Sequence, residues 1–282
     1  MKLRKYHFVF LFMVLINGFI VFQMFIYLLH AFLGFNPSWG MLQYCVAVFN
    51  DQGVMHSIVN NSLNVLIACS FGKFIYMGCR QILMERKWNK YVQANRHTEL
   101  TNYFNGKYKN LSQRIIVIEH QAVLAVTSGF IRPKIILSSA LISDFTEREI
   151  KAIVLHEYSH CRNYDPLLML MIKIMSDSLP FIPILRRLSH YISVWMELDA
   201  DSYAVQHLKS PVDLASGLLK CSKIKRPVSV GVGFADEAIN YRMLRLIEPE
   251  KAIHIPLMQF DSWVISLLTI FIISSIIISG CS

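Results

Sequence analysis

Hydrophobic residues in this chain of 282 gather in three long apolar stretches, and a region of mixed pattern separates the second stretch from the third. The first stretch, residues 7–35, contains only a few polar side chains. A helix of about 20 apolar residues crosses a bilayer, whereas the apolar core of a signal peptide is shorter, about 7–15 residues. This stretch therefore predicts an uncleaved transmembrane helix. Residues 54–79 and 263–278 predict a second and a third.

The mixed region, residues 84–258, has the pattern of a soluble α+β body. Residues 114–139 contain short runs rich in Ile and Val, broken by Gly129, and these predict a small sheet with at least one hairpin. Thr146 and Glu149 then form a capping-box pattern directly before apolar residues at helical spacing, which predicts the start of a helix. The expected fold class is α+β, a mostly helical membrane protein with a small sheet and about three transmembrane helices.

These patterns divide the chain into five parts. The expected parts are an N-terminal tail with the first transmembrane helix (1–35), an outer loop (36–53), a second transmembrane helix (54–83), the α+β domain (84–258), and a third transmembrane helix with a short outer tail (259–282). Residues 166–185 are apolar but include two charges, Lys173 and Asp177, and two prolines after the first position, Pro180 and Pro183. A core helix, an interfacial helix and a re-entrant helix all fit this segment, and we favour a helix packed in the domain or resting on the membrane surface.

The composition supports a membrane protein and excludes a disordered one. Hydrophobic residues make up 54% of the chain and charged residues 17%, against about 25% in ordinary soluble domains. The net charge of +9 reflects membrane orientation, because residues 80–114 hold eight Lys or Arg and two Glu, whereas residues 36–53 hold no Lys or Arg. A multi-pass membrane protein with a cytosolic domain is expected. No arginine-rich helix is present, so nucleic-acid binding is not expected.

The strongest chemical signal is the run His156-Glu157-Tyr158-Ser159-His160, an H-E-x-x-H motif on the helix that the capping box begins. Four residues of helix turn through about 400°, so both imidazoles project from one face. They can then bind one zinc ion, with the glutamate beside the metal as general base. The alternative is a solvated helix face with two incidental histidines, but the apolar turn before the motif favours a buried helix.

A catalytic zinc ion needs a third protein ligand, and a later acidic segment supplies candidates. Glu197 and Asp201 are four residues apart on a predicted helix and share one face. We expect Glu197 to bind the metal and Asp201 to orient a ligand histidine through its second ring nitrogen. Asp165 is a second candidate for such a supporting role. The alternative for these acids is simple solvation of a helix surface.

Four segments resemble the BlaR/MecR type of bacterial membrane zinc metallopeptidase, the gluzincins that cleave transcriptional repressors. They are GFIRPKIILSSALI (129–142), EREIKAIVLHEYSHCRNYD (147–165), FIPILRRL (181–188) and ELDADSYA (197–204). The resemblance covers roughly residues 114–250. Ste24/HtpX-like membrane proteases, which act in quality control, have similar motifs and are the alternative. In the sensor members a penicillin-binding domain follows the last span, whereas this chain ends at Ser282, so β-lactam sensing is not expected.

The resemblance implies a gluzincin-type zinc endopeptidase. Its single zinc ion would be held by His156, His160 and Glu197, with Glu157 as general base. The implied partners are the lipid bilayer and a protein substrate, either a cytosolic repressor or the chain itself, while the oligomeric state is not indicated. A membrane signalling or immunity protein without turnover is an alternative of another class, and the intact Glu157 argues against it.

The resemblance also suggests how substrate and transition state are bound. Similar proteases place an arginine in a C-terminal stretch, so we expect Arg242 to stabilise the oxyanion, with His190 as the alternative. Proteases of this class typically bind substrate as an added strand at a sheet edge. A buried hairpin accounts equally well for the segment concerned. The expected substrate-binding edge is residues 122–128, and the site residues expected within it are Ala122, Val123, Leu124, Ala125 and Val126.

Overall fold

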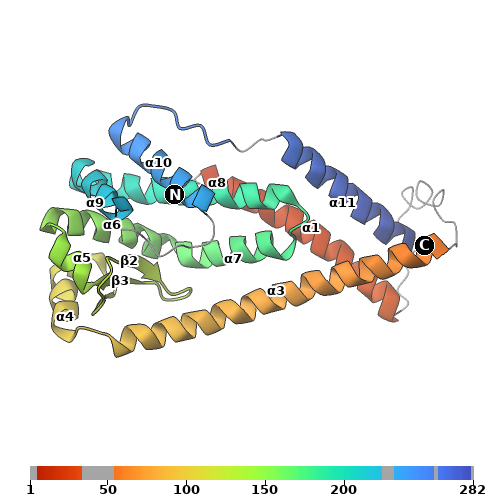
Figure 1. Cartoon of the computed structure of the whole chain (residues 1–282), viewed down its shortest axis with the longest axis horizontal. Helices are drawn as coiled ribbons and strands as arrows, with labels where there is room; N and C mark the ends of the chain where they lie inside the picture. Colours follow the sequence, from red (N-terminus) through yellow and green to blue (C-terminus); the bar gives the residue numbers. More distant parts are fainter. Residues whose placement is uncertain (1–4, 34–53, 224–231, 257–259, 281–282) are drawn as a thin grey trace. The chain divides into compact units, whose positions relative to one another are not determined.

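The computed structural model describes residues 5–33, 54–223, 232–256 and 260–280, and the expected outer loop at 36–53 lies outside them (Figure 1). The described chain is mostly helical with a small sheet, as the sequence predicts. The helices are α1 (Lys5–Leu33), α3 (Val54–Ala94), α4 (Thr98–Lys107), the 3₁₀ turn η1 (Lys109–Leu111), α5 (Ser139–Asp144), α6 (Glu147–Asn163), α7 (Asp165–Ser178), α8 (Pro183–Leu208), α9 (Val212–Lys223), α10 (Val232–Ile247) and α11 (Phe260–Gly280). The strands are β1 (Ile115–Ile118), β2 (Ala125–Ser128) and β3 (Lys134–Ser138).

The chain forms two compact units. The described parts of Met1–Arg80, Ile172–Ser189 and Pro256–Ser282 make up the first unit. Those of Gln81–Met171 and His190–Ile255 make up the second. Helix α3 contributes to both, because it continues to Ala94 and not only to the expected end near residue 83. Residues 81–94 contain no Gly or Pro that would end the helix.

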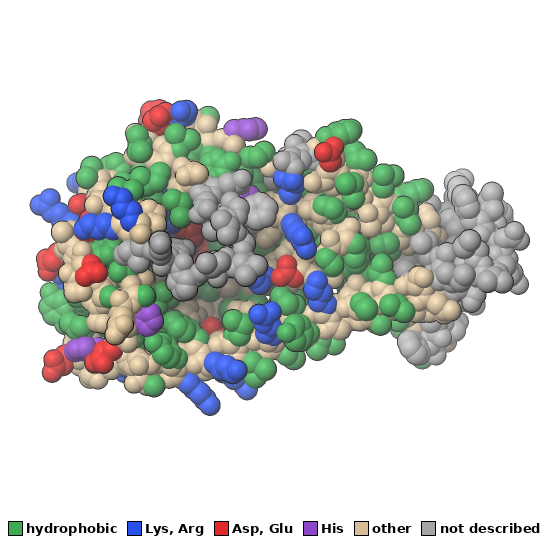
Figure 2. Space-filling view, in the orientation of Figure 1, with side chains coloured by type: hydrophobic (Ala, Val, Ile, Leu, Met, Phe, Trp, Pro, Cys, Tyr) green, Lys and Arg blue, Asp and Glu red, His purple; other side chains and the backbone are tan. Residues whose placement is uncertain are grey.

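The first unit consists of apolar helices. In α1, the segment Tyr6–Leu29 is long and apolar enough to cross a membrane, judged by length and composition, and α11 carries a shorter apolar segment, Phe260–Ser275. The two helices pack together. Figure 2 shows hydrophobic side chains over α11, where Phe271 is 70% exposed. An apolar surface of this kind fits a lipid environment.

The segment 166–185, for which the sequence leaves three alternatives open, is divided between two helices. Helix α7 ends at Ser178 and α8 begins at Pro183. Proline suits the first helical position because its missing N–H would have no partner there. The early part of α8 packs on α11 within the first unit. Ile184 N donates to Ser266 Oγ at 3.0 Å, and Arg187 Nε donates to Ser262 Oγ at 2.7 Å.

The second unit is built around the sheet, whose strand order is β1-β3-β2. Strand β1 runs parallel to β3, with Ile115 opposite Ile135, and β2 runs antiparallel to β3, with Ala125 opposite Leu137. Strands β2 and β3 form the expected hairpin. Gly129 follows β2 at φ +108°, and a Cβ at this position would lie 2.6 Å from the carbonyl oxygen of Arg132. The turn therefore requires glycine.

Alternating Ile and Val residues give the sheet two buried faces. Ile115 and Val117 face a core that includes Phe104 of α4 and Val154 of α6. Ile116 and Ile118 point the other way and pack with Val92, near the end of α3. The sheet is thus covered by helices on both faces, as its near-continuous apolar strands require. Helix α9 lies beside α6 (Figure 1).

The two edges of the sheet differ. Along β1, the outward backbone groups are paired with the segment that leads into α4 and with α4 itself. Val117 O accepts from His97 N at 2.9 Å, Val117 N donates to Thr101 Oγ1 at 3.0 Å, and Ile115 N and O both bond to the side chain of Asn105. On β2, Leu124 O accepts from Ser138 N, so the backbone of alternate residues faces β3. Within the described chain, no hydrogen bond reaches the outward backbone groups of Ala125 and Thr127.

The expected capping box starts α6 and also fastens this helix to α9. Thr146 Oγ1 accepts from Glu149 N, and Thr146 N donates to Glu149 Oε2 at 2.8 Å. The same carboxylate accepts from Ser216 Oγ at 2.6 Å and from Lys220 Nζ at 2.7 Å. Burial acts to raise the pKa of Glu149, but the hydrogen bonds from Lys220, Ser216 and Thr146 outweigh it and lower this pKa to about 2.

Replacing Glu149 with glutamine is expected to lower stability by about 1–3 kcal/mol, because the hydrogen bonds from Lys220, Ser216 and Thr146 lose their charged acceptor. The folded-state pKa lies below the ordinary value of 4.5, so this contribution is complete above about pH 4.5 and is lost as pH falls toward 2. The stability gap between wild type and variant should narrow over that window in thermal unfolding of the detergent-solubilised protein. Glu147→Gln is the control, since that side chain is 79% exposed. An equal loss in both variants would contradict the assignment.

Candidate metal centre

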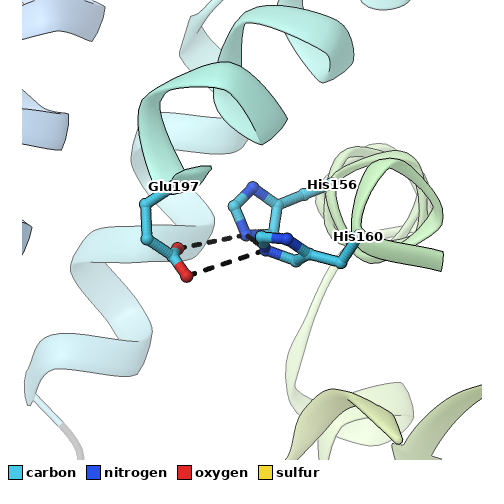
Figure 3. Close-up of side chains that lie close together, drawn as sticks. All are labelled: His156, His160 and Glu197. Atoms are coloured by element: carbon cyan, nitrogen blue, oxygen red, sulfur yellow. Dashed lines mark hydrogen bonds and ion pairs between the residues drawn. The ribbon is translucent and has the colours of Figure 1, made fainter. Parts of the chain in front are cut away.

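The H-E-x-x-H helix and the acidic helix meet at one point in the second unit. His156 and His160 project from α6 toward Glu197 on α8 (Figure 3). The two Nε2 atoms lie 3.1 Å apart. Glu197 Oε2 is 3.4 Å from Nε2 of His156, and Oε1 is 3.6 Å from Nε2 of His160.

This triangle has the dimensions of a zinc site. Tetrahedral zinc holds nitrogen and oxygen ligands at about 2.0–2.2 Å, which places neighbouring ligand atoms about 3.3–3.5 Å apart. Two ring nitrogens that face each other are well explained by a cation shared between them. Two imidazoles and one carboxylate are also the donor set of a catalytic zinc site. The residues present therefore fit zinc.

Each histidine of the triangle has a carboxylate at its other ring nitrogen. Nδ1 of His160 lies 2.7 Å from Oδ2 of Asp165, and Nδ1 of His156 lies 2.8 Å from Oδ1 of Asp201. Tyr164 ends α6 in the left-handed conformation, at φ 56°, so α7 begins at once with Asp165. These contacts fix the rings with Nε2 facing the centre.

Arg242 of α10 joins the two acids of α8. Its Nε and Nη2 donate to the two carboxylate oxygens of Asp201 at 2.7 and 2.8 Å, and its Nη1 lies 2.8 Å from Oε2 of Glu197. The sequence suggests this arginine as an oxyanion donor, and the structure brings it to the metal centre through these acids. His190, the alternative donor, lies on α8 seven residues before Glu197, a rise of about 10 Å.

The charges at the centre depend on one another. Burial and the Arg242 guanidinium act to lower the pKa of His156, but Asp201 and Glu197 outweigh them and raise it to about 9. Burial acts to raise the pKa of Glu197, but Arg242 and the histidines hold it well below its usual value. In the metal-free site these charges favour the protonated form of His156, and a metal ion that bound its ring nitrogen would displace that proton.

Glu157 of α6 is buried, with an exposed fraction of 8%. Its Oε2 accepts a hydrogen bond from Oγ1 of Thr127 on β2 at 2.8 Å. Thr127 lies within the expected edge, residues 122–128, but it was not among the site residues expected from the sequence. The available signal was the two-residue period of a strand, which puts the side chain of Thr127 on the same face as that of Ala125.

Cys161 is buried, and burial raises the pKa of its thiol to about 12, which makes it a packing residue.

The structure places the expected substrate-binding segment at the open edge of the sheet. Ala125 and Val126 belong to β2, while Ala122, Val123 and Leu124 precede it. Strand β2 is an edge strand and also one arm of a hairpin, and three of its four residues are only partly buried. It packs against α6, which carries the H-E-x-x-H motif. Substrate binding at this edge stays a prediction.

Comparison with known proteins identifies the family. Regulatory protein BlaR1 of Bacillus licheniformis is 27% identical over 164 residues, which are 56% of this chain and 27% of that protein. Regulatory protein BlaR1 of Staphylococcus aureus is 23% identical over 125 residues, which are 44% of this chain and 21% of that protein. The alignments thus span about a quarter of these relatives. Residues 50–246 match the BlaR1 peptidase M56 family, and the chain belongs to that family.

Proposed function

We propose that this chain is a membrane-anchored, zinc-dependent endopeptidase. The observation that carries the proposal is the triangle of His156, His160 and Glu197, with Glu157 next to His156 in the H-E-x-x-H run of α6. Membership of a peptidase family supports hydrolysis of peptide bonds. The apolar α1 supports attachment to a membrane.

Zinc held by these three residues would supply Lewis acidity that polarises a peptide carbonyl and a water molecule. Glu157 takes the proton of the attacking water on its carboxylate and later gives it to the leaving amine. Glu197 is 34% exposed at its side chain, whereas His156 is 7% exposed, so the centre is open on the side of the glutamate. That side suits the entry of water and substrate.

The substrate is proposed to bind as an added strand beside β2. The outward backbone groups of Ala125 and Thr127 lack partners within the described chain, whereas those of β1 are paired. An extended peptide can pair with these groups through its own backbone, largely independent of its sequence. Residues Ala122–Val126 and Thr127 would thus bring the scissile bond beside α6.

The substrate proposed is a cytosolic protein, either a transcriptional repressor or the chain itself. Two observations support a regulatory role on the cytosolic side: similarity to regulatory proteins, and the excess of Lys and Arg at residues 80–114. In this topology the chain spans the bacterial plasma membrane three times, through residues 1–35, 54–83 and 259–282. The catalytic domain, 84–258, lies inside.

The test compares new protein N-termini in cells that make wild type, His160→Ala or His207→Ala at matched levels. His207 is an exposed histidine on α8, so its loss controls for histidine replacement. Wild type and the control should produce the same new termini, and His160→Ala none, because one zinc ligand is gone. New termini within a repressor would support the regulatory role, and termini in misfolded membrane proteins would favour quality control. Identical termini in all three cultures would overturn the proposal.

A further inference from the structure

The hydroxyl group of Thr127 lies within hydrogen-bond distance of two oxygen atoms of a single residue, Glu157. Oγ1 of Thr127 lies 2.8 Å from Oε2 of the glutamate side chain and 2.8 Å from its main-chain oxygen. On its other side, Sγ of Cys161 donates weakly to the same hydroxyl at 3.8 Å. The threonine comes from β2 and the glutamate from α6, so the contact joins the open sheet edge to the H-E-x-x-H helix.

A threonine hydroxyl has one proton and two lone pairs, and an ionised carboxylate and a carbonyl both only accept. The hydroxyl therefore donates to one of the two Glu157 oxygens at a time and can turn to the other. While the side chain is a carboxylate, donation to Oε2 fixes its rotamer. When the side chain carries a proton, the hydroxyl can accept that proton in a hydrogen bond and donate to the main-chain oxygen instead.

The backbone of the same residue belongs to the proposed substrate edge. Since the backbone of Leu124 faces β3, the backbones of Ala125 and Thr127 face outward. Two residues later, Gly129 ends the strand in a conformation that other residues adopt only with strain. This turn fixes the register of β2 in the sheet, and therefore also the position along α6 that Thr127 contacts.

We propose that Thr127 is a positioning residue that holds the general-base carboxylate of Glu157 in its working rotamer and links it to the strand where substrate binds. The inference rests on the proposed function and deepens it, since it gives Thr127 two roles. Its backbone belongs to the substrate-binding edge, and its hydroxyl holds the general base Glu157. An added substrate strand would order β2, and the hydroxyl would transmit that order to the carboxylate. Catalytic contact with the substrate itself is left to Glu157.

The variants separate the hydroxyl from the shape of the side chain. Thr127→Val keeps the branched shape and removes the hydroxyl, whereas Thr127→Ser keeps the hydroxyl. Thr101→Val is the matched control, because Thr101 also packs against the sheet and, within the described residues, its hydroxyl bonds only to the backbone of Val117. Zinc content and thermal unfolding of each purified protein show whether the fold and the metal centre are intact.

The first readout is binding of acetohydroxamic acid to the zinc-loaded protein by calorimetry. This small chelator places its hydroxyl and N–H beside the metal, where a correctly held Glu157 carboxylate accepts from them. Thr127→Val is expected to weaken binding about 10-fold, as for loss of one oriented charged hydrogen bond. Thr127→Ser should restore it and Thr101→Val should leave it unchanged. In a Glu157→Ala background, Thr127→Val should have no further effect.

The second readout is turnover of a substrate found from the wild-type termini. Thr127→Val should lower kcat about 10-fold with little change in KM, and Thr127→Ser should recover kcat. An equal loss of hydroxamate binding in both Glu157 backgrounds, or a serine variant as impaired as the valine variant, overturns the inference while the metal centre stands. A wild-type protein that binds neither zinc nor the hydroxamate overturns the proposed function, and the inference with it.

Discussion

Glu157→Gln is expected to keep its zinc ion and to lower the rate of peptide hydrolysis by about 10²- to 10⁴-fold. Glu157 is not among the three residues of the metal triangle, so zinc affinity should change little. Glutamine has the same shape as glutamate, and its amide oxygen can still accept from Thr127. It cannot take up a proton from water, however, and it cannot return one to the leaving amine. The loss should therefore appear in kcat and spare the fold.

The measurement combines zinc content by mass spectrometry with the rate of appearance of the new N-termini that wild type produces. Glu248→Gln is the matched control, since Glu248 is an exposed acid with a surface ion pair to Lys251. It should match wild type in both quantities. Wild-type rates of proteolysis in Glu157→Gln would exclude a general-base role. Loss of zinc from the same variant would mean that Glu157 acts as a ligand.

Sequence reasoning was most successful where the determinants are local. The H-E-x-x-H spacing puts His156 and His160 on one face through helix geometry alone, and the capping box of Thr146 and Glu149 starts the helix as expected. The four-residue spacing of Glu197 and Asp201 likewise predicts a shared face. The structure places the Glu197 carboxylate next to the Nε2 atoms of His156 and His160. It places the Asp201 carboxylate at Nδ1 of His156.

Contacts between distant segments could not be read from such spacings. Strand β1 pairs in parallel with β3, although β2 lies between them in the sequence, and this pairing gives the order β1-β3-β2. Short Ile- and Val-rich runs do not specify such a pairing. Thr127 is 30 residues from Glu157, and its role depends on which face of β2 meets α6. The double attachment of Lys220 and Ser216 to Glu149 likewise follows from the packing of α9 on α6.

The position of Arg242 shows the same limit at the centre itself. The resemblance predicts an arginine in this stretch, but the pairing with Asp201, 41 residues earlier, depends on how α10 docks. Three of its nitrogens contact Asp201 and Glu197. A guanidinium has five N–H donors, so donors remain for an oxyanion. The oxyanion role therefore stays a prediction beside the ion pairs that the structure contains.

Arg242→Met is expected to destabilise the zinc-free protein by about 3–5 kcal/mol, the usual cost of removing one partner from a buried ion pair. Asp201 is 1% exposed and would keep its negative charge without the guanidinium that now compensates it. Glu197 would lose its closest cation in the same step. Bound zinc replaces part of the missing positive charge, so the loss should be smaller in the zinc-loaded protein.

Thermal unfolding of the detergent-solubilised protein measures the loss of stability without zinc, in chelator, and the loss with zinc, in excess zinc. In chelator, Arg242→Met should unfold about 10 °C below wild type, and zinc should raise its midpoint by more than it raises that of wild type. Arg245→Met is the matched control, because Arg245 lies on the same helix, is exposed and contacts only a backbone oxygen, at 3.4 Å. Equal midpoints for the two variants would show that the Arg242 ion pairs contribute nothing to the fold. A zinc-induced rise no larger than in wild type would show that Arg242 does not compensate the charge of the metal-binding carboxylates.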